Sequence, residues 1–224
     1  MPVTSRRTRL RSDERPAAVH LTLVRHAEVA AEHQGRLYGG ADVPLSAAGL
    51  AASRALAPAL ASGPLDAVCC SPLQRARVLA EDVAARARVP LLVEAAFREL
   101  DRGDWTGLSQ DELEARSPGA LARYTADPEA AAAPGGERES QLAARVWGAL
   151  LQLVAQRPGQ RLVLVAHAHV LRVITARLAG WTPAESMQHF LPPLGAVPVS
   201  LAPDGRGELL APPPGIGQRE LLKR

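Results

Sequence analysis

The sequence predicts an α/β protein, a three-layer α/β/α sandwich around a mostly parallel central sheet. Short runs of β-branched and apolar residues alternate along the chain with alanine- and leucine-rich stretches of helical length. This alternation is typical of a parallel sheet that helices cover on both faces. The chain has 224 residues, of which 47% are hydrophobic, and this suffices for a substantial core and argues against global disorder.

The expected strands are apolar runs that glycine, proline or polar residues interrupt. They lie at Val19–Val24, Leu65–Cys70, Val89–Val93 and Arg161–Ala166, followed by a hairpin of Val197–Leu201 and Glu208–Leu210 around Asp204-Gly205.

The expected helices carry start and stop signals. Ser46 is typical of an N-cap, and the helix after it ends before Gly63-Pro64, while Ser71-Pro72 opens a second helix. These two and the remaining expected helices lie at residues 47–61, 72–87, 110–116, 119–126, 141–156 and 170–178.

Three parts are expected along the chain: a disordered basic tail at 1–17, a single domain at 18–211 with a variable cap at about 105–140, and a loose tail at 212–224. Five arginines and two acids in residues 1–17 account for the whole net charge of +3. A basic tail on a neutral body is only a weak nucleic-acid signal, so no nucleic-acid partner is predicted.

Composition also excludes several classes of protein. The two cysteines, Cys69 and Cys70, are too few for a disulfide framework or a zinc site, and they fit a reducing compartment. The longest apolar runs are far too short to span a bilayer. We therefore predict a cytoplasmic protein with no membrane partner, and the sequence leaves open whether it forms a homodimer.

Arg25 and His26 directly follow the first expected strand, and His167 and His169 follow the fourth. Ligand sites of such folds lie beyond the carboxyl ends of the parallel strands, so these segments are expected to meet at one edge. A guanidinium offers a planar fork to phosphate, and an imidazole can attack phosphorus. Alone, Arg25-His26 is weak evidence, and a surface pair is the favoured interpretation.

Arg75 is expected in the first turn of the second helix, where free N–H groups attract anions. The alternative for Arg75 is a structural salt bridge. His167 and His169 have the spacing of a metal-ligand pair, but no acid or cysteine nearby completes a ligand set, so we predict no metal. His169 is the better candidate for a core histidine.

Glu99 is the candidate acid, because a leaving alkoxide needs a proton. Asp101 and Asp104 are chemical rivals that the sequence alone does not separate. Trp105, Tyr124 and Trp181 are open to two interpretations, as core residues or as the lining of a pocket.

The chain resembles the histidine phosphatase superfamily, the phosphoglycerate mutase-like family, and within it the phosphatase branch. The resemblance covers about residues 19–200 and rests on six motifs in the family's order. They are Leu23-Val24-Arg25-His26; Gly39 with Asp42-Val43-Pro44-Leu45-Ser46 and Gly49; Ser71-Pro72-Leu73-Gln74-Arg75-Ala76; Arg98-Glu99-Leu100 with Gly103-Asp104-Trp105 and Gly107; Gly135-Gly136-Glu137; and Val165-Ala166-His167 with Leu171-Arg172.

The resemblance implies a phosphoglycerate mutase-like fold and a catalytic role for His26, Glu99 and His167. His26 would be the nucleophile, and Arg25, Arg75 and His167 would bind the phosphoryl group. Glu99 would protonate the leaving oxygen and later deprotonate water. The resemblance implies no metal or organic cofactor, and the partner is a small phosphorylated substrate.

Four positions depart from the family pattern: Ala27 and Ala168 replace glycines, and Val29 and Glu32 replace a hydroxyl residue and an asparagine. These departures put phosphate affinity and substrate choice in doubt, although the catalytic set is complete. The motifs around Gly39 and Gly103 resemble those of α-ribazole phosphatases and broad-specificity acid phosphatases.

The leading hypothesis is a phosphatase that hydrolyses small phosphomonoesters through a phosphohistidine intermediate. A cofactor-dependent phosphoglycerate mutase is the alternative, because it uses the same intermediate. The span from Leu100 to Ala166 has few basic residues positioned for a bisphosphate, which favours hydrolysis. A phosphate-binding pseudoenzyme that acts as a regulator is the third hypothesis.

Overall fold

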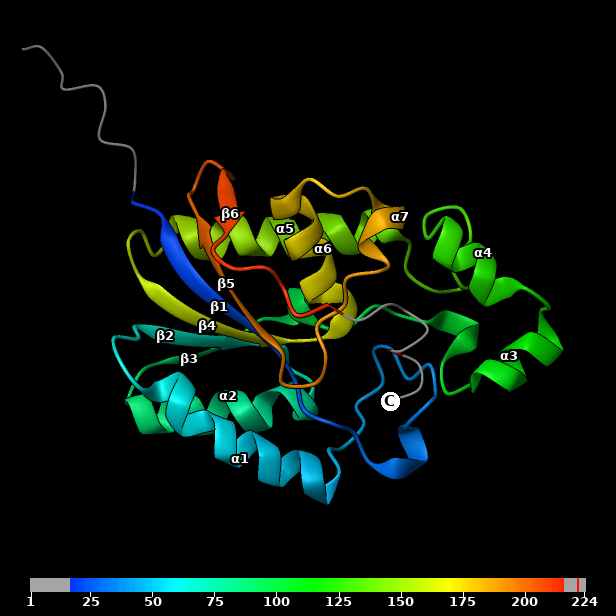
Figure 1. The fold of residues 1–224 in the computed structure, drawn as a ribbon, viewed down its shortest axis with the longest axis horizontal. Coiled ribbons are helices and arrows are strands. Elements are labelled where there is room, and N and C mark those ends of the chain that lie inside the picture. The colour runs from blue at the N-terminus through cyan, green and yellow to red at the C-terminus, as the bar shows by residue number, and fades with distance from the viewer. Residues whose placement is uncertain (1–16, 216–220, 222–224) are drawn as a thin grey trace, which may run out of the picture.

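A six-stranded sheet forms the centre of the computed structural model, which describes residues 17–215 and 221 (Figure 1). The strand order is β3-β2-β4-β1-β5-β6; the first four strands are parallel, and β5 and β6 run antiparallel. The strands are β1 (Val19–Arg25), β2 (Ala67–Cys70), β3 (Leu91–Val93), β4 (Arg161–Ala166), β5 (Ala196–Leu201) and β6 (Gly207–Leu209). Residues 1–16 of the predicted tail at 1–17, and residues 216–220 and 222–224 of the predicted tail at 212–224, lie outside the described part of the chain.

Helices cover the sheet on both faces, α1 and α2 on one and α5 and α6 on the other, while α3 and α4 lie beyond one end of the sheet (Figure 1). The α-helices are α1 (Ala47–Ala61), α2 (Gln74–Ala87), α3 (Gln110–Arg116), α4 (Ala120–Ala126), α5 (Glu139–Ala155), α6 (Ala168–Ala179) and α7 (Pro183–Ser186). The short 3-10 helices are η1 (Ala31–His33), η2 (Ala95–Phe97) and η3 (Gly103–Trp105). The predicted three-layer sandwich with a mostly parallel sheet is thereby confirmed.

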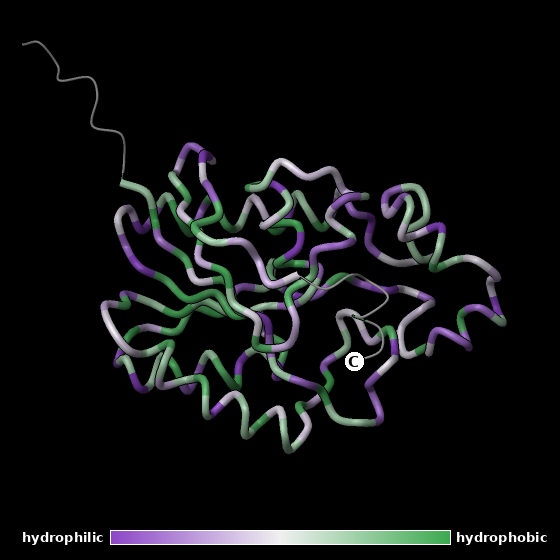
Figure 2. The backbone as a smooth tube through the Cα atoms, viewed as in Figure 1, coloured by the Kyte–Doolittle hydropathy of each residue, from purple (hydrophilic) through white to green (hydrophobic). Residues whose placement is uncertain are grey.

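The strands are apolar because both faces of the sheet are covered. All four residues of β2 are buried, and so is every residue of β4 after Arg161. The hydrophobic segments gather in the centre of the molecule, and polar segments lie at its margins (Figure 2). Strands of this kind appear in a sequence as continuous apolar runs, which is why they are readily predicted.

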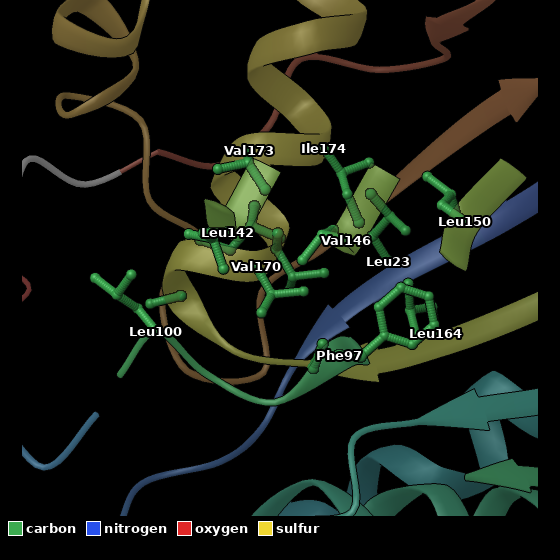
Figure 3. Packing of buried hydrophobic residues seen from close by; sticks show 14 of the residues in the cluster. Leu23, Phe97, Leu100, Leu142, Val146, Leu150, Leu164, Val170, Val173 and Ile174 are labelled. Carbon is green, nitrogen blue, oxygen red and sulfur yellow. The ribbon is translucent and has the colours of Figure 1, made fainter. Parts of the chain in front are cut away.

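The larger core lies between the sheet and helices α5 and α6 (Figure 3). Phe97, from η2, packs with Leu23 of β1 and Leu164 of β4, and α5 contributes Val146 and Leu150. A smaller core on the opposite face lies under α2. Phe97 therefore fixes the segment that leads to Glu99 against the sheet.

The cap segment packs into the same core. Trp105 and Tyr124 are buried and meet edge to face, with 5.9 Å between their ring centroids, so both are core residues. Gly103 has a positive φ of 45°, and a Cβ there would lie 2.3 Å from the Pro134 carbonyl oxygen. Only glycine permits this close approach, which docks the 134–136 segment on η3.

A buried ion pair joins α5 and α6. Arg172 of α6 donates two hydrogen bonds to the carboxylate of Glu139 on α5, with N–O distances of 2.6 and 2.7 Å. Arg172 also donates to the Ser186 hydroxyl at the end of α7. A pair buried this deeply is costly to break, because the remaining charge would have no partner.

We expect Phe97→Ala to lower the free energy of unfolding by about 3–5 kcal/mol, the usual cost of removing a buried aromatic ring. Val93→Ala is the control, since that side chain is 49% exposed. Urea unfolding measures both. A loss for Phe97→Ala no greater than that of the control would contradict the packing described above.

Candidate active site

Each of the four parallel strands delivers a candidate residue at its carboxyl end. β1 ends at Arg25, followed by His26, and β4 leads into His167. β2 leads through Ser71 to Arg75 in the first turn of α2, and β3 leads through η2 to Glu99. The register pairs Arg25 with Ala166, so the two strands that carry the histidines end in step.

His26 is buried and held in one tautomer. Its Nδ1 donates a hydrogen bond to the Ala27 carbonyl oxygen at 2.7 Å. Because a carbonyl only accepts, the proton is on Nδ1 and the lone pair is on Nε2. Burial, together with the charges of Arg75 and Arg25, holds the pKa of His26 well below its usual range. The neutral Nε2 therefore has its lone pair available without deprotonation.

His167 lies beside His26, with 5.1 Å between the ring centroids and an interplanar angle of 60°. Its Nε2 is hydrogen-bonded to the Ser71 hydroxyl at 2.7 Å, and Ser71 Oγ also accepts the Leu73 N–H. Burial and the Arg75 charge lower the pKa of His167 as well. Two neutral imidazoles therefore lie side by side at the carboxyl edge of the sheet.

Arg75 brings a fully buried guanidinium to this edge. It donates to the carbonyl oxygens of Ala41 and Gly39 at 2.6 and 2.7 Å, and it lies over the Tyr38 ring. The salt bridges found within 4 Å among the described residues do not include Arg75. The structure therefore does not show the alternative interpretation of Arg75, a structural salt bridge.

Arg25 is fixed by the loop that precedes β5. Its Nη1 donates to the Leu191 carbonyl oxygen at 2.8 Å, and its backbone N–H donates to the Gly195 carbonyl. The antiparallel strand therefore does more than extend the sheet, because its entry loop orients the first phosphate-binding candidate.

Glu99 is buried, and both of its carboxylate oxygens accept backbone N–H groups. The N–H of Leu100 donates to Oε1 at 2.8 Å, and the N–H of His169, in the first turn of α6, donates to Oε2 at 3.2 Å. Its rivals Asp101 and Asp104 are exposed. Asp101 accepts the Gly103 N–H in a local turn.

A small cavity opens beside Arg25 and Glu99. Its lining includes Arg25, Glu99, Arg102, Ala168 and His169. Arg25, a phosphate-binding candidate, and Glu99, the acid candidate, therefore line the same cavity.

Sequence reasoning missed two members of this neighbourhood, Arg102 and Ser71. Arg102 is buried and donates to Nε2 of His169 at 2.6 Å. Nothing local marks Arg102, which lies in a loop, whereas Ser71 was visible as part of a motif but had no role assigned. His169 is buried between Arg102 and the rings of Tyr124 and Phe190, as expected of a core histidine.

The four departures fall in two places. Ala27 and Ala168 are buried at the site, and Ala168 lines the cavity. Val29 is buried and pairs with Leu45, while Glu32 is exposed on η1. The effect of the four residues on phosphate binding stays a prediction.

Within residues 17–215 and 221, no cluster of three or more histidines, cysteines or acids has the arrangement of a metal site. The same residues contain no helix that is long and apolar enough to cross a bilayer.

The fold places two neutral histidines, His26 and His167, together with buried Arg25 and Arg75 at the carboxyl edge of the sheet, and Arg25 also lines the neighbouring cavity. The model of the histidine phosphatase superfamily (branch 1) matches residues 21–210. The chain is 33% identical to the adenosylcobalamin/alpha-ribazole phosphatase of Salmonella typhimurium over 77% of this chain and 85% of the relative. It is 31% identical to phosphoserine phosphatase 1 of Hydrogenobacter thermophilus over 72% and 77%.

Solved structures agree with the sequence comparisons. A mycobacterial glucosyl-3-phosphoglycerate phosphatase superposes with a TM-score of 0.79 at 26% identity, covering 87% of this chain and 98% of that one. Bacillus stearothermophilus YhfR superposes with a TM-score of 0.80 at 25% identity, covering 87% and 96%. The chain belongs to the histidine phosphatase superfamily, and it is a phosphoric monoester hydrolase.

The three buried histidines predict a loss of stability in acid. Burial and neighbouring arginines hold the pKa of His26, His167 and His169 below the usual 6.5, so the unfolded chain binds more protons at low pH. The stability is therefore fully present above about pH 6.5 and is lost as the pH falls below it. Each histidine contributes up to about 1.4 kcal/mol per pH unit.

Urea unfolding at several pH values between 7.5 and 5 measures this slope. We expect His169→Gln to reduce the slope of the unfolding free energy against pH by the contribution of one histidine. His20→Gln, at an exposed position, is the matched control and should leave the slope unchanged. Equal slopes in wild type and His169→Gln would contradict the assignment of His169 as a buried neutral group.

Proposed function

We propose that this protein hydrolyses small phosphomonoesters through a phosphohistidine formed on His26. The observation that carries the proposal is the pinned tautomer of His26, whose Nδ1–H is held by the Ala27 carbonyl next to two arginines. That arrangement leaves a neutral Nε2 facing a region of positive charge, which is what attack on a phosphate dianion requires.

In the first step, Nε2 of His26 attacks phosphorus and the bond from phosphorus to the leaving oxygen breaks. Glu99, as the carboxylic acid, gives its proton to that oxygen. Arg25, Arg75 and His167 hold the phosphoryl oxygens and stabilise their charge during the in-line transfer. Their fixed positions mean that little reorganisation accompanies the reaction.

In the second step, the Glu99 carboxylate takes a proton from water, and the water oxygen attacks phosphorus. The bond from phosphorus to Nε2 breaks, so inorganic phosphate leaves and His26 returns to its neutral form. The relatives reported above are named as phosphatases, which favours water over a bound sugar acid as the acceptor.

We further propose a cytoplasmic location. Cys69 and Cys70 are free and buried, and burial raises the pKa of the Cys69 thiol to about 12, so both fit a reducing compartment without being reactive. A homodimer stays a prediction, which light scattering on the purified protein checks.

We expect His26→Ala to lower phosphate release from 4-nitrophenyl phosphate to the rate of the buffer blank, because the nucleophile is gone. Acid-quenched wild type should carry phosphate on histidine, which 31P NMR detects as a phosphoramidate. Retained turnover by His26→Ala, with folding verified by circular dichroism, would refute the phosphohistidine mechanism.

We expect Glu99→Gln to slow poor leaving groups much more than good ones, since only alkoxides need a proton on departure. Alkyl phosphates should lose at least about 100-fold in kcat, within the range that proton transfer contributes, and 4-nitrophenyl phosphate should lose far less. Asp101→Asn is the matched control on the same loop. Equal losses on both substrates would exclude Glu99 as the acid.

A further inference from the structure

Arg102 is a buried arginine that the mechanism above does not use. It is 5% exposed and lines the cavity that also contains Arg25 and Glu99. The ion pairs within 4 Å in the described part of the chain do not include it. A buried guanidinium that no carboxylate pairs within 4 Å is costly, and an anionic ligand would offset that cost.

The neighbours of Arg102 hold its side chain in place but leave its charge uncompensated. Nη2 donates to Nε2 of His169 at 2.6 Å, and the guanidinium lies 4.9 Å from the centroid of the Tyr124 ring. Its stem packs so closely against Gly39 that a Cβ there would lie 2.6 Å from its Cγ. Imidazole, ring face and backbone orient the group, and none of them carries a negative charge.

His169 also ties Arg102 to the leaving-group side of the site. Its backbone N–H donates to Glu99 Oε2, and its ring accepts from Arg102. The proposed acid and this free cation are therefore positioned by the same residue and line the same cavity. A group bound to Arg102 would belong to the part of the substrate that departs with the oxygen that Glu99 protonates.

We propose that Arg102 selects phosphomonoesters whose leaving group carries a carboxylate. The planar guanidinium fork of Arg102 matches a carboxylate, while of the other arginines at the cavity Arg25 is assigned to the phosphoryl group and Arg36 is paired with Glu112. This inference rests on the proposed function, since it assigns a substrate class to the same site.

Two substrate pairs that differ at the carboxylate test this selection. The pairs are 3-phosphoglycerate with glycerol 3-phosphate, and O-phosphoserine with phosphoethanolamine. We expect wild type to have the higher kcat/KM for the carboxylate-bearing member of at least one pair. Arg102→Gln, which keeps a donor for His169, should lower that preference about 10- to 100-fold, mostly through KM, as loss of a charge-assisted hydrogen bond predicts.

Arg98→Gln is the matched control, because Arg98 is exposed and donates to the Gly40 carbonyl. It should keep the wild-type preference, and Arg102→Lys, which retains the charge, should restore part of it. A ratio unchanged in Arg102→Gln, or an equal loss on both members of each pair, would overturn the inference and leave Arg102 as a structural brace.

Wild type alone also decides the matter if Arg102→Gln fails to fold. Preference for the carboxylate-free member of both pairs would refute the selection while 4-nitrophenyl phosphate hydrolysis upheld the proposed function. Loss of 4-nitrophenyl phosphate hydrolysis as well would refute the proposed function itself.

Discussion

Positive charge buried at the carboxyl edge of the sheet is the constraint on which the site depends. Arg75 donates to backbone carbonyls and Arg102 to an imidazole, and these neutral acceptors orient the guanidinium groups without cancelling their charge. Such an arrangement is stable only where the surroundings hold every donor in place. Burial, together with this positive charge, lowers the pKa of His26 and His167 and keeps both neutral, because a buried imidazolium would lose its hydration and add a further charge of the same sign.

Loops from other parts of the fold supply the buried carbonyl groups that accept these hydrogen bonds. The loop before α1 turns its carbonyl groups at Gly39 and Ala41 toward Arg75, and Asp42 in that loop accepts the first N–H of α2. The entry loop of β5 gives Arg25 its carbonyl at Leu191. Segments far apart in the sequence thus meet around the arginines, and the rigid parallel strands fix where they meet.

The sequence was sufficient to predict the sheet, its flanking helices and the strand ends that carry the histidines, because each depends on local apolar patterning. It could not predict Arg102, because the residue lies in a loop where no period or cap constrains it. Its burial comes from Gly39, Tyr124 and His169, which are distant in sequence. For the same reason Glu99 could not be separated from Asp101 until the tertiary packing buried one and exposed the other.

Burial alone does not distinguish a structural arginine from a functional one, and this chain contains both kinds. Arg172 is as deeply buried as Arg75, yet it meets Glu139 through two hydrogen bonds, and its charge is balanced within the fold. Arg102, in contrast, donates to the neutral ring of His169 and lines a cavity. The charge state of the partner is therefore the informative feature: a carboxylate balances the charge of an arginine within the fold, whereas a neutral acceptor leaves a buried charge, for which we propose a counter-ion on the substrate.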